Sequence, residues 1–172
     1  MNRIFISLWA FVLCIYSCQH SSQPDPATNK AFNEFLDRKF DEMLYRNPEF
    51  ASSLGLKYNY NQWSDRSYAF DQKELEYNIA TLDSLHRFDK SKLDSQSLLS
   101  LRLFEEDVAL AKERMKWEGY NYELNQMEGV VTDIPAFLIN VHSIDSVEDV
   151  KAYLERLANM NIPFDQTIAN IK

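Results

Sequence analysis

The sequence has 172 residues, with 18 Lys and Arg against 26 Asp and Glu, and a formal net charge of −8 at pH 7. This acidic balance argues against nucleic acid as a partner, because binding to phosphates requires clustered positive charge. Only three glycines occur among many Leu, Glu, Lys and Ala residues, which favours helices over a turn-rich β architecture. We therefore expect an all-α fold, a multi-helix, antiparallel bundle-like domain with irregular connecting loops.

The chain begins with a pattern typical of a signal peptide. An apolar run covers residues 4–17, and Arg3 places positive charge ahead of it. The run is about 14 residues long, shorter than the roughly 20 residues that a helix needs to span a bilayer. Polar residues (QHSSQPDP) follow it. We predict a signal peptide over residues 1–17, in front of the helical domain, rather than a membrane-spanning anchor.

Ser17 and Cys18 end this run in a way that resembles the lipobox of bacterial lipoproteins. In those proteins the cysteine thiol is diacylated and becomes the first residue of the mature chain. We predict lipid attachment, labelled by palmitate, at Cys18, which makes membrane lipid a partner of the protein. Tyr16 is larger than the residue usual at its position. The alternative is an ordinary secretory signal that is cut nearby and leaves a free thiol.

Cys14 and Cys18 are the two cysteines of the chain. Cys14 would be removed with the signal peptide, so we expect neither a disulfide nor a zinc site built on cysteine. Gln19, rather than Asp, follows Cys18. By analogy with enteric lipoproteins, this favours a lipid-anchored location in the cell envelope at the outer membrane.

Residues 18–29 are polar and contain prolines, which predicts a tether in front of a helical domain over residues 30–172. Residues 30–47 repeat apolar side chains at steps of three and four, as one face of a helix requires. These side chains are Phe32, Phe35, Leu36, Phe40, Met43 and Leu44. Asn47 and Pro48 then suit the start of a short second helix, which Gly55 would close.

Residues 56–70 (LKYNYNQWSDRSYAF) are rich in Tyr, Asn and Trp and follow neither helical nor strand periodicity. We interpret them as a loop and as the best candidate for a ligand-binding surface. Its aromatic rings could stack on sugar or peptide while polar groups supply hydrogen bonds. The candidate residues are Tyr58, Tyr60, Trp63 and Asp65. The alternative is that the aromatic side chains pack the loop against the helices.

Two longer helices are predicted next, over residues 71–88 and 94–119, and the short link between them indicates an antiparallel hairpin. The second helix has an apolar seam of Leu98, Leu101, Phe104, Val108, Ala111 and Met115. Residues 120–145 are irregular, apart from a short apolar helix over 134–140 that Pro135 would open.

Ser146 and Asp149 resemble a capping box that starts a helix with four apolar residues on one face, Val147, Val150, Leu154 and Leu157. Pro163 suits the first position of a last helix. The apolar stripe of that helix meets no stop signal before Lys172. Either this helix frays or, as we favour, the sequence is the front part of a longer protein.

No motif in the sequence supplies catalytic chemistry. The three histidines, His20, His86 and His142, do not form the H-E-x-x-H spacing that places two imidazoles around zinc. There is also no G-x-S-x-G elbow and no phosphate-binding glycine loop. The acidic run 105–107 suits a solvated helix face, and His142 stands in a loop without a visible partner. We therefore assign no catalytic residue, no metal ligand and no cofactor to this sequence.

Several phrases, in this order, resemble the N-terminal region of the bacterial domain of unknown function 885 family: NPEFASSLGL, WSDRS, LRLFEED, and the segment from YELNQMEGVV to TIANIK. The resemblance spans residues 30–172 and is strongest over 122–172. Members of that family are helical, often secreted lipoproteins, and several times longer. They look like zinc metallopeptidases because a later helix carries an H-E-x-x-P-G-H-H type motif. No part of that motif is present here, so the resemblance transfers no zinc ligand or catalytic residue.

The resemblance implies that zinc and a peptide substrate belong only to a missing C-terminal continuation. We expect a lipid-anchored chain that acts as the non-catalytic N-terminal helical portion of a zinc-peptidase-like protein, so its own enzymatic status stays open. One alternative is a self-contained lipoprotein that binds glycan or peptide through residues 56–70. Another is an envelope structural protein without a small ligand.

Overall fold

The computed structural model describes residues 23–120 and 122–171. The predicted signal peptide over 1–17 and the predicted lipid attachment at Cys18 lie outside these ranges. All regular structure in the described ranges is helical, which confirms the predicted all-α fold. None of the helices in this part of the chain is both long and apolar enough to cross a membrane.

The first described helix, α2 (Pro26–Arg46), begins at residue 26 rather than at residue 30. Asp25 caps it by accepting hydrogen bonds from the first backbone N–H groups, and Pro26 occupies a position where its missing N–H costs no hydrogen bond. Residues 26–29, predicted as the end of the tether, are therefore helical. The sequence alone does not reveal this helix start, because helix caps and flexible linkers contain the same polar residues and prolines.

The short helix α3 (Pro48–Ser53) follows at once, as predicted, with Asn47 at its N-cap. Gly55 lies just beyond its end with a φ of +76°, a conformation that glycine adopts without penalty. The N–H of Gly55 donates to Ser52 O over 2.9 Å and closes the helix. This stop leads the chain into the irregular segment 54–67, which contains turns.

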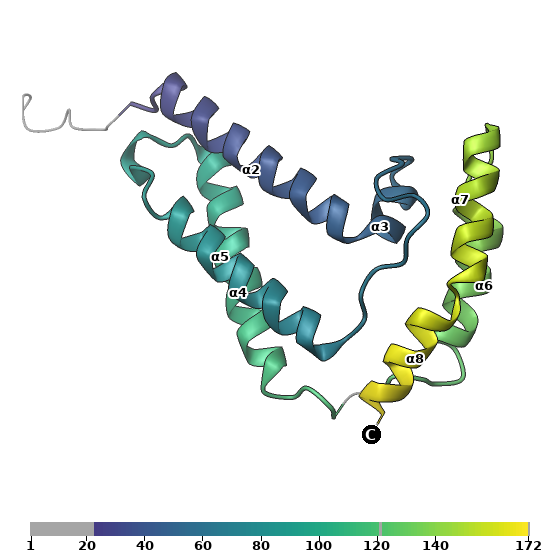
Figure 1. Ribbon diagram of the computed structural model, residues 1–172. Coiled ribbons are helices and arrows are strands. Elements are labelled where there is room, and N and C mark those ends of the chain that lie inside the picture. The colour runs from purple at the N-terminus through teal and green to yellow at the C-terminus, as the bar shows by residue number, and fades with distance from the viewer. Residues whose placement is uncertain (1–22, 121, 172) are drawn as a thin grey trace, which may run out of the picture.

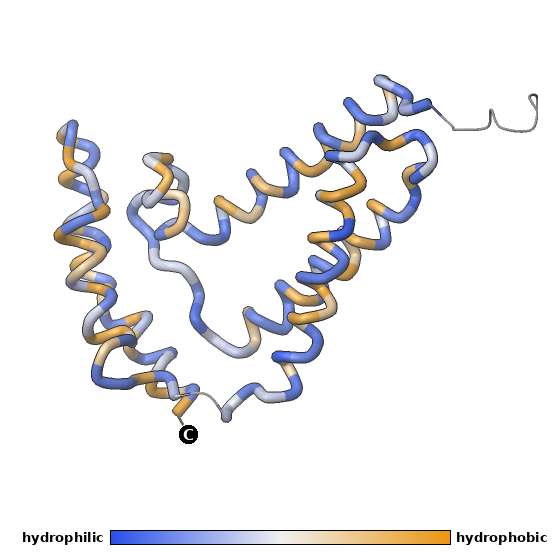
Figure 2. Tube along the Cα trace, turned by 180° about the vertical axis from the view of Figure 1, so that it is seen from behind, coloured by the Kyte–Doolittle hydropathy of each residue, from blue (hydrophilic) through white to orange (hydrophobic). Residues whose placement is uncertain are grey.

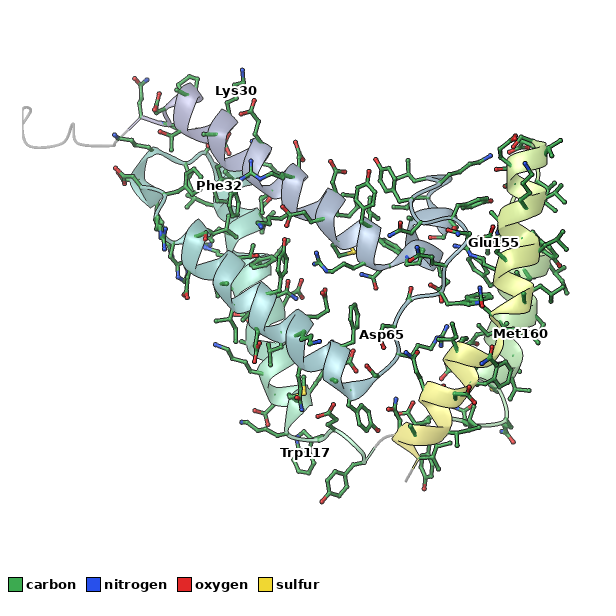
Figure 3. The ribbon with its side chains drawn as sticks, in the orientation of Figure 1. Lys30, Phe32, Asp65, Trp117, Glu155 and Met160 are labelled. Carbon is green, nitrogen blue, oxygen red and sulfur yellow. The ribbon has the colours of Figure 1, made fainter. Side chains whose placement is uncertain are left out.

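Helices α4 (Tyr68–Leu85) and α5 (Ser95–Met115) form the predicted antiparallel hairpin, joined through the 3-10 turn η1 (Lys90–Lys92). Helix α2 lies along this hairpin (Figure 1). Phe32 points from α2 into the hairpin (Figure 3) and is fully buried. The core here consists of Phe32, Leu85, Leu93 and Leu101, with Phe35, Leu36, Leu82, Phe88, Leu98 and Phe104 packed against it.

Three further helix starts differ from the sequence prediction, and one of them is that of α8 (Asn161–Asn170), which begins two residues before Pro163. Helix α4 begins at residue 68 rather than at 71, because the Ser67 side chain caps it by accepting a backbone hydrogen bond. Helix α6 (Val130–Asn140) begins at residue 130, so Pro135 lies inside this helix and does not open it. Gly129, with a φ of +127°, makes the turn into α6.

Helices α6, α7 (Val147–Ala158) and α8 (Asn161–Asn170) form a second group, drawn in green to yellow in Figure 1. Its core consists of Val130, Ile134 and Leu138 of α6, with Trp63, Phe137, Tyr153, Met160 and Phe164 packed against it. Because buried residues flank Pro135 on both sides, tertiary packing holds α6 together through the proline. Figure 2 shows both groups of helices from behind.

Ser146 caps α7 as predicted, by accepting a hydrogen bond from Asp149 N–H over 3.2 Å. The apolar residues predicted on one face of this helix share a face that is exposed. The exposed fractions lie between 41% and 67% for Val147, Val150, Leu154 and Leu157. The opposite face buries Asp149 and Arg156. The buried side chains of α7 are therefore polar, and the contacts that they make explain their burial.

Candidate functional site

The side chain of Arg156 connects α7 to two segments from the first half of the chain, and it is fully buried. Its Nε donates to Gln62 O, in segment 54–67, over 3.0 Å. Its Nη2 lies 3.2 Å from Ser52 Oγ and 3.4 Å from Pro48 O, both in α3. Arginine suits such a position because its planar group offers five donors in fixed directions.

Three aromatic rings surround the guanidinium group of Arg156. Its Cζ lies 4.7 Å from the ring centroid of Phe137, 5.0 Å from that of Tyr60 and 5.6 Å from that of Trp63. Burial lowers the pKa of Arg156 to about 10, against the opposing influence of Glu49 and Tyr60. The side chain is still charged at neutral pH, and the ring faces offset part of the cost of burying that charge.

Tyr60 and Trp63, two of the four residues predicted for ligand binding, come together at Arg156. The hydroxyl of Tyr60 donates to Ser143 O over 2.8 Å, and Trp63 Nε1–H donates to Arg156 O over 2.9 Å. Tyr60 is buried and Trp63 is half-buried. Their polar atoms thus serve contacts within the protein, as the packing alternative expects.

The other two predicted residues lie apart from this cluster. Tyr58 stacks on Tyr45 of α2, with ring centroids 4.3 Å apart. Asp65, labelled in Figure 3, is exposed and accepts hydrogen bonds from Ser67 N–H and Gln166 Nε2, each over 2.9 Å. The four residues therefore do not form one cluster.

His142, for which the sequence offers no partner, is buried beside Arg156. Its Nδ1 lies 2.9 Å from Arg156 Nη1, and its Nε2 lies 3.2 Å from Asp149 O. Because arginine can only donate, Nδ1 accepts and Nε2 carries the proton. Burial first, and the charge of Arg156 as well, lower the pKa of His142 against the hydrogen bond to Asp149 O. His142 and Arg156 are not separated by three or four residues, so no helical spacing in the sequence indicates that they pair.

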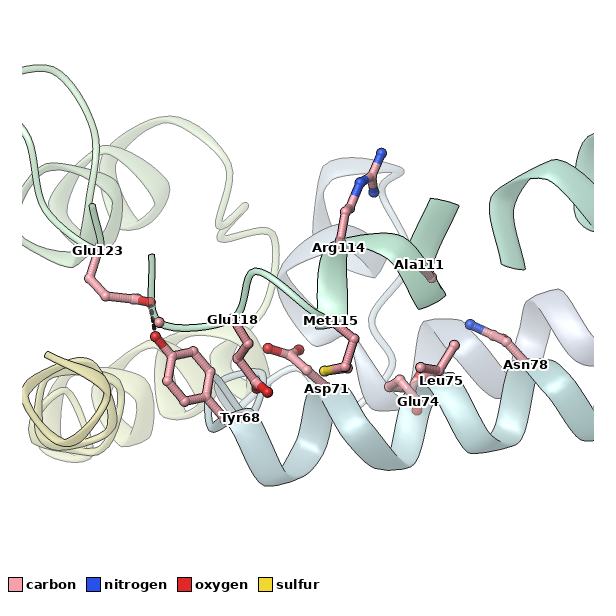
Figure 4. A pocket seen from close by; sticks show the side chains of 11 residues that line it. Tyr68, Asp71, Glu74, Leu75, Asn78, Ala111, Arg114, Met115, Glu118 and Glu123 are labelled. Atoms are coloured by element: carbon pink, nitrogen blue, oxygen red, sulfur yellow. Dashed lines mark hydrogen bonds between the residues drawn. The ribbon is translucent and has the colours of Figure 1, made fainter. Parts of the chain in front are cut away.

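A cavity of about 340 Å³ lies between α4, the end of α5 and the segment that follows α5 (Figure 4). Its volume falls within the range of small-molecule sites. A dashed line in Figure 4 marks the hydroxyl of Tyr68, which donates to Glu123 over 2.9 Å. Carboxylates dominate the polar lining, which consists of Tyr68, Asp71, Glu74, Asn78, Arg114, Glu118 and Glu123.

Some carboxylates of this cavity have a bonding partner within the protein and others do not. Glu74 forms an ion pair with Arg46 at 2.5 Å. By contrast, Glu118 Oε1 is buried without a hydrogen-bond partner in the described part of the chain. Burial raises the pKa of Asp71, and the neighbouring charges of Glu118 and Glu123 raise it further. A cavity with this balance suits a positively charged group.

Sequence reasoning missed this cavity, although the predicted hairpin carried a signal for it. Asp71 lies in the first turn of α4, whereas Glu118 follows the end of α5, and an antiparallel pair brings those two ends together. A raised carboxyl pKa inside a cavity is a feature of many functional sites. Among residues 23–120 and 122–171, no group of three or more His, Cys, Asp or Glu is placed to hold a metal ion.

The family model described as "Bacterial protein of unknown function (DUF885)" matches residues 48–172. This range runs from the start of α3 and includes the cavity, Arg156 and His142. No curated protein matches the chain. Since the family match covers more than half of the sequence, the chain belongs to the DUF885 family of bacterial proteins.

Proposed function

We propose that this chain is the amino-terminal helical portion of a lipid-anchored, zinc-peptidase-like protein of the bacterial cell envelope, and that residues 30–172 supply no catalytic group. Membership of the DUF885 family supports the proposal, together with the resemblance of residues 30–172 to the front region of longer, metallopeptidase-like lipoproteins. Under this proposal the helices form one wall of a substrate cleft. The zinc chemistry belongs to a further part of the longer protein.

The observation that carries the proposal is the exposed apolar face of α7. Val150, the least exposed of its four apolar residues, is still 41% exposed, whereas Arg156 on the opposite face is fully buried. A surface helix normally buries its apolar face, and large exposed apolar patches mark surfaces that other protein covers. The face therefore fits a portion that packs against further protein of the same chain.

The cavity lined by Asp71 would determine which chemical groups of a substrate this wall binds. Its carboxylates suit the amino terminus or a basic side chain of a peptide, because a carboxylate oxygen that is buried without a partner, as Glu118 Oε1 is, gains from a cationic one. The alternative function, glycan or peptide binding through residues 56–70, has less support. Tyr60 and Trp63 already use their polar atoms within the protein.

The proposed lipid anchor is Cys18, at the end of the apolar run 4–17. Membrane lipid is then a partner of the protein, and the outer membrane is its proposed location. The thiol of Cys18 would carry the acyl chains, while the signal peptide and Cys14 would be removed.

An antibody against residues 30–172, applied to envelope fractions of the native bacterium grown with radioactive palmitate, tests the proposal. We expect a labelled band well above 20.2 kDa, the mass of the present chain. Cys18→Ala should abolish the label, whereas Cys14→Ala should leave it. A native band at the mass of the chain itself contradicts the proposed longer protein, and a label that survives Cys18→Ala contradicts the anchor.

A further inference from the structure

Arg156 joins three parts of the molecule through three different nitrogen atoms, and one of these bonds depends on the protonation of its partner. Nε and Nη2 reach segment 54–67 and α3, at Gln62 O and Ser52 Oγ. Nη1 reaches His142, between α6 and α7, over 2.9 Å. The carbonyl and the hydroxyl do not titrate near neutral pH, whereas imidazole does.

His142 accepts from Arg156 only while its Nδ1 lacks a proton. A proton on Nδ1 turns the acceptor into a second donor and places a second positive charge beside the guanidinium group. Water screens these charges poorly, because Arg156 is 0% exposed and His142 is 6% exposed. Two neighbouring rings restrict the imidazole. The ring of Tyr60 stacks on it with centroids 4.2 Å apart, and the ring of Tyr153 meets it edge-on with centroids 5.3 Å apart.

We propose that Arg156 and His142 form an acid-sensitive latch, which holds segment 54–67 and α3 against α6 and α7 at neutral pH and loosens this packing when His142 takes up a proton. The latch differs from an ordinary surface contact because one side chain fastens both segments. This inference goes beyond the proposed function and does not depend on it.

The groups that face the latch set the direction of its response. They come from α7, from segment 54–67 and from α3, and they are Asp149, Tyr153, Arg156, Lys57, Tyr60 and Glu49. Burial first, and then the cations Arg156 and Lys57, hold the pKa of His142 below its ordinary value of 6.5. Asp149 opposes this shift, but its carboxylate is already bound by Lys57 at 2.8 Å.

The sign of the pH effect follows from this lowered pKa. The folded protein favours the neutral form of His142. The stability that the latch contributes is therefore fully present above pH 6.5. It is lost as the pH falls from this value through the folded pKa of His142.

The full chain labelled with 5-fluorotryptophan reports on the latch by fluorine NMR. The chain has three tryptophans. Trp63 lies beside Arg156, whereas Trp117 is 58% exposed beyond the end of α5, and Trp63→Phe and Trp117→Phe assign their two signals. Between about pH 8 and about pH 5, where histidine titrates, we expect the Trp63 signal to change with a midpoint below 6.5. The Trp117 signal should stay constant. A Trp63 signal that does not change over this range overturns the proposal.

Two variants separate the latch from a general effect of acid. His142→Asn keeps an acceptor near the position of Nδ1 but does not titrate, so its Trp63 signal should stay at the neutral-pH position throughout. His86→Asn is the matched control, because His86 is exposed and pairs with Glu105 at 2.7 Å, and it should keep the transition. An acid transition that persists in His142→Asn overturns the proposal.

If His142→Asn fails to fold, as judged by circular dichroism, the unsubstituted protein still provides the test. The C2 proton of His142 should then titrate with the same midpoint as the Trp63 signal. Different midpoints for the two signals overturn the latch.

Discussion

Lys57 Nζ lies 2.8 Å from Asp149 Oδ2, and this ion pair joins segment 54–67 to the first turn of α7. The same carboxylate oxygen accepts a hydrogen bond from Asp145 N–H over 3.0 Å, so Asp149 reaches the residue before the N-cap. These contacts, with the ammonium group of Lys57 first, lower the pKa of Asp149 to about 2. A side chain predicted only as part of a helix cap thus also fixes the position of a distant segment.

Acid should weaken the fold through Asp149. Because its pKa in the folded protein is about 2 and its ordinary value is 3.8, the stability it contributes is present above 3.8 and lost as the pH falls toward 2. Asp149→Asn should lower the Tm at neutral pH and flatten the loss over this interval. Asp145→Asn is the control, since its carboxylate pairs with the same Lys57 at 3.4 Å but is 75% exposed, and an exposed pair contributes little stability. An Asp149→Asn protein with an unchanged acid profile would contradict the assignment.

Replacing Arg156 should cost more stability than replacing an exposed arginine. Arg156→Met removes the donor to Gln62 O and leaves buried acceptors without partners, each at roughly 1–3 kcal/mol. We expect the free energy of unfolding in urea to fall by about 2–5 kcal/mol. Arg102→Met, at an exposed position of α5, should change it by less than about 0.5 kcal/mol. Equal small losses in both variants would show that Arg156 does not organise this region.

Trp63→Ala distinguishes a structural role of segment 54–67 from a binding role. Because Trp63 packs against the core of α6 and donates to Arg156 O, we expect a loss of about 2–4 kcal/mol in the free energy of unfolding. Glycan arrays with the unsubstituted protein should show no saturable binding. Saturable glycan binding that Trp63→Ala abolishes, with stability unchanged, would favour the alternative function.

Asp71→Asn should stabilise the protein at neutral pH. Burial and the charges of Glu118 and Glu123 raise the pKa of Asp71, so its stabilising contribution is present below 3.8 and lost as the pH rises through the raised value. Asn keeps the size of the side chain without its charge. The Tm should rise at pH 7, while Asp83→Asn, on the same helix but outside the cavity, leaves it unchanged. A lower Tm for Asp71→Asn would mean that the carboxylate has a stabilising partner.

Most of the helices could be predicted because a repeated step of three and four residues defines a helix whatever it packs against. The hairpin of α4 and α5 followed from its short link. Helix bounds were less accurate where one capping side chain decides the start, as Asp25 does for α2 and Ser67 for α4. In α6 the core residues override the local signal of Pro135.

The surroundings of Arg156 could not be predicted for a different reason. The pattern of α7 shows which residues share a face, but it does not show which face meets the rest of the protein. That face is decided by partners such as Lys57 and Gln62, which lie in a segment without periodicity. The carboxylates of the cavity are likewise separated in the sequence, and only the hairpin brings Asp71 and Glu118 together.

We propose that these helices are a scaffold and that catalysis, if the chain belongs to a longer protein, is located elsewhere in it. The most direct test is the zinc content of purified residues 19–172 after dialysis, together with cleavage of a peptide library by the same sample. A catalytic zinc needs about three protein ligands and a nearby general base. We predict no stoichiometric zinc and no cleavage. Stoichiometric zinc retained through dialysis, with cleavage that a chelator abolishes, would contradict the claim and place an active site among these helices.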